Sequence, residues 1–306
     1  DDGRGEALVV FSDLAFAENG LQPGDLSPAL EALRSVTGKA TAQARFAWTE
    51  EDLNGTAVVE LIDLAFTTDR VSVEGLNTRA VFDSLFPPST PAGQKLTLRR
   101  IDPAIALDDV VLNYRVMPGD PPRLVIQRAS SGFAGGEIAI AGFVFDPAGS
   151  SQDMELRLER LDLAKLFAMI KVEGLTGSGR ISGVIPLTVT GDSLIIRDGR
   201  LDAAGPGVLR FRSEATEAAL KGGGKPMTLL LRALQNFRYD SLSLTVKKPA
   251  RGDPEIMLRL AGRNPDILDG HPFAFNIGLT GNLDAITEAI RKGVRLKGAL
   301  FRTLVK

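Results

Sequence analysis

Alternation of apolar and polar side chains runs through most of this chain and constrains its fold more than any other feature. In Glu155–Arg160, leucines alternate with charged residues. Successive side chains of a β-strand point to opposite faces, so a period of two is typical of a half-buried strand. Gly, Asp, Asn and Pro clusters separate such runs, as strand connections require. About sixteen to twenty runs of this kind predict a mostly β protein. Clear examples cover 96–98, 124–126, 138–140, 242–246, 256–260 and 273–279.

Helical patterns are few and short. Pro28–Val36 predicts a helix with Ser27 as its N-cap and Gly38 as its stop, and Leu161–Ile170 predicts another. Thr78–Phe86 predicts a helical turn that Pro87 halts. The two ends of 213–237 predict helical pieces around a glycine-rich loop. The last apolar residues, over 283–305, recur near helical spacing opposite a basic face, so we expect an amphipathic helix there.

An apolar sheet face of this length needs a cover. Strongly twisted open sheets rarely exceed about ten strands without curling or splitting. A closed barrel or a two-sheet sandwich would bury the face against itself. A sheet folded lengthwise into a trough would leave an apolar channel, which a lipid acyl chain could fill at a gain of ~0.8 kcal/mol per methylene. The periodicity alone leaves these three solutions open.

We predict two parts along the chain: a single elongated domain over 1–282 and an amphipathic segment over 283–306. The segment either caps the open end of the trough or docks on a membrane surface or a partner. No run reaches the roughly 18 to 20 apolar residues of a membrane span, and the first residues are not a signal peptide. Any export signal or anchor is therefore expected upstream.

The chain carries little equipment for catalysis. It has no cysteine and one histidine, His271, which excludes thiolate chemistry and zinc sites of the His/Cys type. His271 is expected in a loop just before a strand. The glycine-rich run Gly174–Gly183 lacks the Gly-Lys-Ser/Thr of a phosphate loop, and Asp108 and Asp109 should point to opposite faces. A net charge of −2 with interleaved signs disfavours nucleic acid. We therefore predict no catalytic residue, no metal and no cofactor.

Short motifs in a fixed order resemble the YdbH family of intermembrane phospholipid transport proteins, within the wider AsmA-like group. The similarity is densest over 161–211 and covers most of the chain from about 40 to 285. The motifs are Leu161-Asp162-Leu163-Ala164, Gly174-Leu175 with Gly177, Gly179, Ile181, Gly183 and Pro186-Leu187, then Ile196, Gly199, Leu201, Ala203, Gly207 and Leu209-Arg210, and downstream Gly262-Arg263-Asn264-Pro265 and Gly270-His271-Pro272-Phe273.

The resemblance implies an elongated, curled antiparallel sheet that forms a trough with an apolar groove, in the periplasm of a Gram-negative bacterium. It implies that this chain is the C-terminal part of a longer protein that is tethered to the inner membrane and reaches towards the outer membrane. It also implies an outer-membrane lipoprotein partner that extends the sheet, and the edge of the last strand, Phe273–Leu279, is our candidate for that contact.

On this interpretation the protein transfers phospholipids, whose acyl chains lie in the groove with their headgroups in water. The alternatives are a structural or assembly factor for outer-membrane biogenesis and, more weakly, a polysaccharide-acting enzyme on a β scaffold. The candidate groove-lining residues are Leu124, Ile126, Ile138, Ile140, Leu156, Leu158, Leu187, Val189, Leu194, Ile196, Leu242, Leu244, Leu258, Leu260, Phe273, Phe275 and Ile277.

Overall fold

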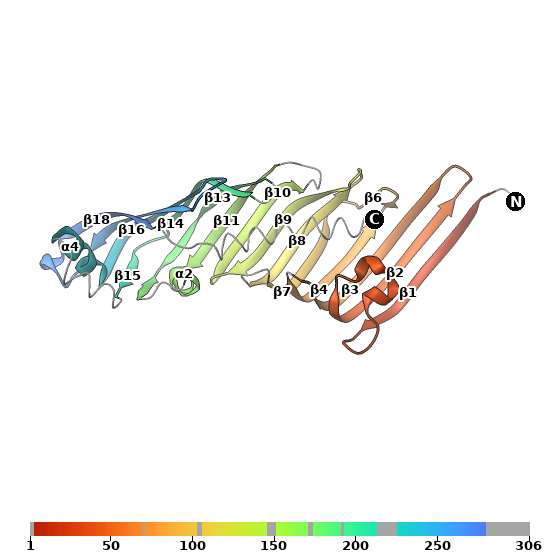
Figure 1. Cartoon of the computed structure of the whole chain (residues 1–306), viewed down its shortest axis with the longest axis horizontal. Helices are drawn as coiled ribbons and strands as arrows, with labels where there is room; N and C mark the ends of the chain where they lie inside the picture. Colours follow the sequence, from red (N-terminus) through yellow and green to blue (C-terminus); the bar gives the residue numbers. More distant parts are fainter. Residues whose placement is uncertain are drawn as a thin grey trace.

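One antiparallel sheet of sixteen strands dominates the computed structural model, which describes residues 3–69, 71–102, 106–145, 151–170, 174–190, 193–212 and 225–279 (Figure 1). The mostly β prediction is confirmed. The strands of this sheet are β1 (Gly5–Phe16), β2 (Arg34–Trp48), β3 (Leu53–Thr67), β4 (Ser72–Phe82), β7 (Gln94–Asp102), β8 (Leu107–Met117), β9 (Arg123–Phe133), β10 (Gly136–Phe145), β11 (Gln152–Asp162), β12 (Leu175–Ser178), β13 (Arg180–Thr190), β14 (Ser193–Ala203), β15 (Gly207–Phe211), β16 (Phe237–Lys248), β17 (Glu255–Arg263) and β18 (Pro272–Leu279).

Short helices and one hairpin sit on opposite long edges of the sheet. From β1 to β11 the successive strands of the sheet pair as an antiparallel meander, so the connections alternate between the two edges. Further on, β12 and β15 pair with each other and leave this order. The helical elements all fall in connections of one edge, which we call the helix-bearing edge (Figure 1). They are α1 (Pro23–Leu26), η1 (Pro28–Leu30), α2 (Leu163–Ile170), α4 (Lys225–Leu234) and η2 (Leu268–Gly270). The other edge carries a hairpin of β5 (Ser84–Leu85) and β6 (Pro88–Ser89).

Cross-strand pairing places apolar side chains on the same side of every long strand. In the first strands Phe11 lies opposite Ala42, which lies opposite Val59. In the last strands one row of partners crosses seven strands: Ile138, Leu158, Gly183, Leu201, Leu244, Leu258 and Ile277. We call this side the apolar face and the other side the polar face.

Bulges keep the apolar pattern in phase along each strand. The register shifts between Phe11 and Leu14 in β1, between Leu61 and Leu64 in β3, and between Leu158 and Leu161 in β11. In a regular strand, residues three positions apart point to opposite faces. The two apolar residues of each pair are three apart, and the bulged residue between them returns the second side chain to the apolar face. A bulge also bends its strand and increases the local twist. Repeated from strand to strand, the bulges curl the sheet, and β1 and β18 are not paired with each other, so the predicted curled, unclosed sheet is confirmed.

Two predicted helices are wrong. Only a turn at Pro28–Leu30 is helical in the first, and β2 begins at Arg34. The side chain of Gln22 explains this, because its amide donates to the Val36 carbonyl (3.0 Å) and accepts from the Val36 N–H (2.9 Å) as a neighbouring strand would. The second, Thr78–Phe86, falls mostly in β4, where pairing with β3 overrides the helical spacing.

The other helical predictions fare better. Leu161–Ile170 becomes the end of β11 and α2, and the second piece of 213–237 becomes α4, which starts at Lys225. The first piece of that stretch and the amphipathic segment 283–306 lie outside the described residues. His271 lies just before β18, as predicted, and the run Gly174–Gly183 contains β12 and the start of β13.

Helices α2 and α4 pack on the apolar face at the end of the sheet that holds β18. β14 and β15 pair with successive parts of β16, so the chain bends between them. Tyr239 anchors this bend, since its hydroxyl donates to the Ser178 carbonyl at 2.8 Å. The buried cluster here, which we call the terminal core, consists of Leu158, Leu161, Leu163, Ile181, Leu201, Leu209, Leu234, Phe237, Tyr239, Leu242 and Leu260.

Candidate functional site

The candidate lining residues all lie in hydrophobic clusters of the apolar face. Ten belong to the terminal core or pack against it: Ile138, Leu156, Leu158, Leu242, Leu244, Leu258, Leu260, Phe273, Phe275 and Ile277. Leu187, Val189, Leu194 and Ile196 form a second group, and Leu124, Ile126 and Ile140 pack in a third around Phe143. The structure thus brings them together on one face, while their contact with a lipid stays a prediction.

The sequence interpretation missed the part of the apolar face near β1, where large side chains remain in contact with solvent. We call it the open end, and it consists of Val9 (37% exposed), Phe11 (47%), Trp48 (40%), Leu53 (50%) and Phe86 (51%). Alternation is hidden in β1, because Leu8 to Phe11 are all apolar. The aromatic pair Phe46 and Trp48, two residues apart in β2, is the signal that could have revealed it.

The β5–β6 hairpin overhangs the open end. A Cβ placed on Gly55 of β3 would lie 3.1 Å from the Leu85 side chain and 3.2 Å from the Phe86 ring. The centroids of the Phe86 and Phe46 rings are 6.4 Å apart. The hairpin therefore folds from its edge onto the apolar face of β2 and β3, where glycine leaves room for it.

A neutral polar spot interrupts the apolar face in its middle. Tyr114 of β8 lies opposite Gln94 of β7, whose side-chain oxygen accepts the Val81 N–H at 2.9 Å. Burial raises the pKa of Tyr114, and a hydrogen bond with Thr78 partly opposes that rise. The phenol is consequently uncharged at physiological pH, which keeps the spot compatible with an apolar ligand.

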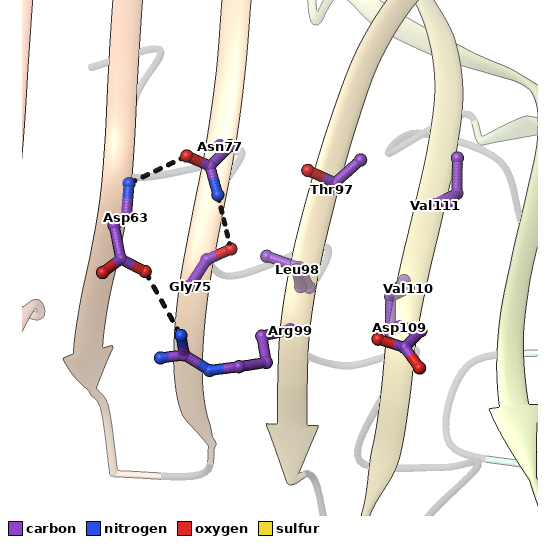
Figure 2. A pocket seen from close by; sticks show the side chains of 9 residues that line it. All are labelled: Asp63, Gly75, Asn77, Thr97, Leu98, Arg99, Asp109, Val110 and Val111. Carbon is purple, nitrogen blue, oxygen red and sulfur yellow. Dashed lines mark hydrogen bonds and ion pairs between the residues drawn. The ribbon is translucent and has the colours of Figure 1, made fainter.

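The polar face holds a depression over β3, β4, β7 and β8 (Figure 2). Several of its polar groups interact: Arg99 pairs with Asp63 (3.6 Å), and the Asn77 side chain accepts the Asp63 N–H (2.9 Å) and donates to the Gly75 carbonyl (3.0 Å). Asp63 and Gly75 have left-handed backbones at bulges. Two of the bulges that bend the sheet therefore lie at this depression.

Charged groups of the polar face pair in solvent. Arg200 hydrogen-bonds Asp202 and thereby lowers the pKa of that carboxyl group. Glu155 and Arg157 form a similar exposed pair at 2.9 Å. Within the described ranges no three His, Cys, Asp or Glu side chains gather in a way that could hold a metal ion.

Comparison with known proteins identifies a family. A family model described as intermembrane phospholipid transport protein YdbH matches residues 1–301. Neither the curated proteins nor the solved structures contain a match to this chain. Among the described residues, no helix is long and apolar enough to span a bilayer.

Proposed function

The chain belongs to the YdbH-like family of intermembrane phospholipid transport proteins, and from this premise we propose that its apolar face conducts the acyl chains of phospholipids across the periplasm. The observation that carries the proposal is the continuity of that face from β1 to β18, kept in phase by bulges. An ordinary sandwich would cover such a face with a second sheet. Here the sheet curls instead, and it leaves part of the face uncovered.

The energetics of a lipid explain why such a face is useful. Each methylene held out of water contributes ~0.8 kcal/mol, so a chain of about sixteen carbons gains on the order of 12 kcal/mol. A lipid therefore crosses an aqueous gap slowly unless it is covered. The headgroup needs no cover and can stay in water at the rim of the trough. No bond is broken in this process, so we assign no catalytic residue and no enzymatic activity.

The dimensions favour a bridge over a carrier for one molecule. Strands lie ~4.8 Å apart, so the fourteen strands that follow one another from β1 to β18 span roughly 60 Å, against about 30 Å for the hydrocarbon core of a bilayer. One phospholipid would cover only part of this length. We propose that the seventeen lining residues form successive parts of one path along which lipids slide.

A matched pair of substitutions tests the path. Leu112 and Val111 are neighbours in β8 and both are half-buried, but Leu112 pairs with Leu96 on the apolar face and Val111 with Thr97 on the polar face. Leu112→Asp should abolish co-purification of phospholipid, measured by mass spectrometry, because it places a charge in the path. Val111→Asp should retain the lipid. Urea unfolding of both variants controls for stability, and equal lipid content in the two folded variants would refute the path.

Placement between the membranes is also part of the proposal. We propose a periplasmic protein that is tethered to the inner membrane upstream, with an outer-membrane lipoprotein adding a strand to β18. Among the described strands β18 pairs only with β17, so its other edge can accept one. A photo-crosslinker in place of the exposed Ala274 should capture such a lipoprotein in cells. Adducts with inner-membrane proteins alone would contradict this orientation.

The terminal core supports the rival function, a structural factor for outer-membrane assembly. Its interior is filled by side chains, as a lipid-free scaffold would be. We favour lipid conduction because the open end is not filled. Phospholipid absent from both the wild-type protein and the Val111→Asp control would decide for the rival.

A further inference from the structure

We propose that phospholipid acyl chains rest on the open end of the apolar face, and that the terminal core closes the path at the other end until α2 or α4 moves away. This inference rests on the proposed function and locates the lipid within it. It assigns a binding site for acyl chains to Val9, Phe11, Trp48, Leu53 and Phe86.

The innermost side chains of the terminal core are closed to solvent. Leu161 and Phe237 are 0% exposed, Tyr239 is 1% exposed, and Leu260 is 2% exposed. The side chains packed around them come from the strands and from helices α2 and α4, which lie on the same apolar face. The protein's own side chains already supply the contacts that a lipid would make.

Helix α2 covers part of the terminal core. Leu163 is buried at its start, and Leu166 and Phe167 pack against the core. A Cβ on Gly177 of β12 would lie 2.7 Å from the Phe167 ring, so the ring rests directly on the strand backbone. The helix thus closes the helix-bearing edge where the sheet bends.

The open end has the opposite character on the same face. Ala42 and Ala44 of β2 lie opposite Phe11 and Val9 of β1. The surface beside Phe11 and Val9 is therefore formed by small side chains and is recessed. The hairpin residue Phe86 stands above Phe46 but is itself half exposed. A phospholipid chain is the occupant that fits, because the family is one of phospholipid transport and this surface continues the apolar path.

The two faces of β1 offer an internal control. Val10 (56% exposed) and Leu8 (55%) are more exposed than Phe11 and Val9, but they lie on the polar face opposite Gln43 and Arg45. An edge strand that merely attracts apolar molecules would bind them on both faces. A site on the apolar face would bind them on one.

Site-specific photo-crosslinking tests the proposal in the whole chain as it is purified with its cellular lipids. The photoreactive amino acid p-benzoylphenylalanine replaces Phe11 at the open end, Phe275 packed against the terminal core, or Val10 on the polar face. Both phenylalanines accept this larger aromatic ring with the least change. After irradiation, intact-protein mass spectrometry should show a phospholipid adduct at Phe11, at least tenfold more abundant than at Phe275 or Val10.

Each other result has a definite meaning. Equal adducts at Phe11 and Phe275 would overturn the closed end while leaving lipid conduction intact. Equal adducts at Phe11 and Val10 would show a nonspecific apolar edge, and a protein adduct at Phe11 without lipid would assign the open end to a partner strand; both overturn the proposal. Phospholipid at none of the three positions, and none in the unlabelled protein, would refute the proposed function as well.

Discussion

Arg160 illustrates how single residues with unusual backbone angles keep this sheet in phase. Its φ of 53° is left-handed, a region that glycine adopts freely and other residues adopt at a cost. Its N–H donates to Ser182 Oγ (2.9 Å), and its carbonyl accepts from Arg180 (2.7 Å). These bonds hold the bulge that turns Leu161, which is fully buried, back to the apolar face.

Glycine substitutions should therefore have opposite effects at two arginines of β11. Arg160→Gly should raise the free energy of unfolding by up to about 1 kcal/mol, because it relieves the left-handed backbone. Arg157→Gly should lower it by about 0.5–1 kcal/mol, because Arg157 lies in regular extended strand. Urea denaturation measures both. A loss of equal size at the two positions would show that the bulge stores no strain.

The two tyrosines should make the fold sensitive to alkali. Burial raises the pKa of both Tyr114 and Tyr239 above the ordinary value. The unfolded chain then loses its phenolic protons first, so the stability is intact below pH ~10 and falls as the pH rises above it. Tyrosinate absorbance should appear together with the loss of the β-sheet circular dichroism signal, and Tyr114→Phe should unfold at higher pH. Tyrosinate formation in a fully folded sheet would contradict this.

At the scale of elements, Tyr239 holds the bend at the β18 end of the sheet through its hydrogen bond to Ser178. A Cβ on Gly207, at the start of β15, would overlap the Tyr239 hydroxyl and the Ser178 carbonyl oxygen. A Cβ on Gly205, two residues earlier, would have no atom within 4 Å. Glycine is therefore required at the first position by a close approach and not at the second.

Alanine substitutions at Gly207 and Gly205 should destabilise the protein to different extents. Gly207→Ala should lower the free energy of unfolding by at least ~2 kcal/mol, as overpacking does, and should loosen the terminal core. Gly205→Ala should change it by less than about 0.5 kcal/mol. Thermal unfolding of both variants is the measurement. A tolerated Gly207→Ala would mean that β15 can move away from β16 at little cost.

The strands could be predicted from the sequence much better than the helices. A period-two pattern such as Glu155–Arg160 arises because one face of the strand is buried and the other is in solvent. The pattern is therefore visible within the strand's own residues. Pro28–Val36 has helical spacing, but Gln22 acts as a strand partner for Val36 from fourteen residues away. Contacts between residues so far apart leave no periodic signal in the local sequence.

At the scale of the whole molecule, the apolar face could be predicted but its two ends could not. Alternation identifies which residues share a face and thus grouped Leu158, Leu244 and Leu258 correctly. It cannot say whether that face meets solvent, a ligand or itself. The answer depends on the bend at Tyr239 and on the helices α2 and α4, whose positions follow from packing across many strands.

The open end near β1 and the terminal core near β18 should differ in local stability. Buried apolar contacts and protected backbone hydrogen bonds raise the free energy of local opening. Amides of β16 and β17, which carry the terminal core, should therefore exchange most slowly with solvent, and amides of β1 and β2 should exchange faster. Removal of bound phospholipid should speed exchange further in β1 and β2, because acyl chains would supply the missing cover there.

Hydrogen exchange read by mass spectrometry, on lipid-loaded and delipidated protein, measures this directly. The Leu112→Asp variant is the control, since it should resemble the delipidated protein near β1 without any treatment. A change confined to β16 and β17 would mean that lipid sits in the terminal core and that the packed side chains there give way to it. A uniform change would mean that lipid stabilises the sheet as a single cooperative unit, with no open end distinct from a closed one.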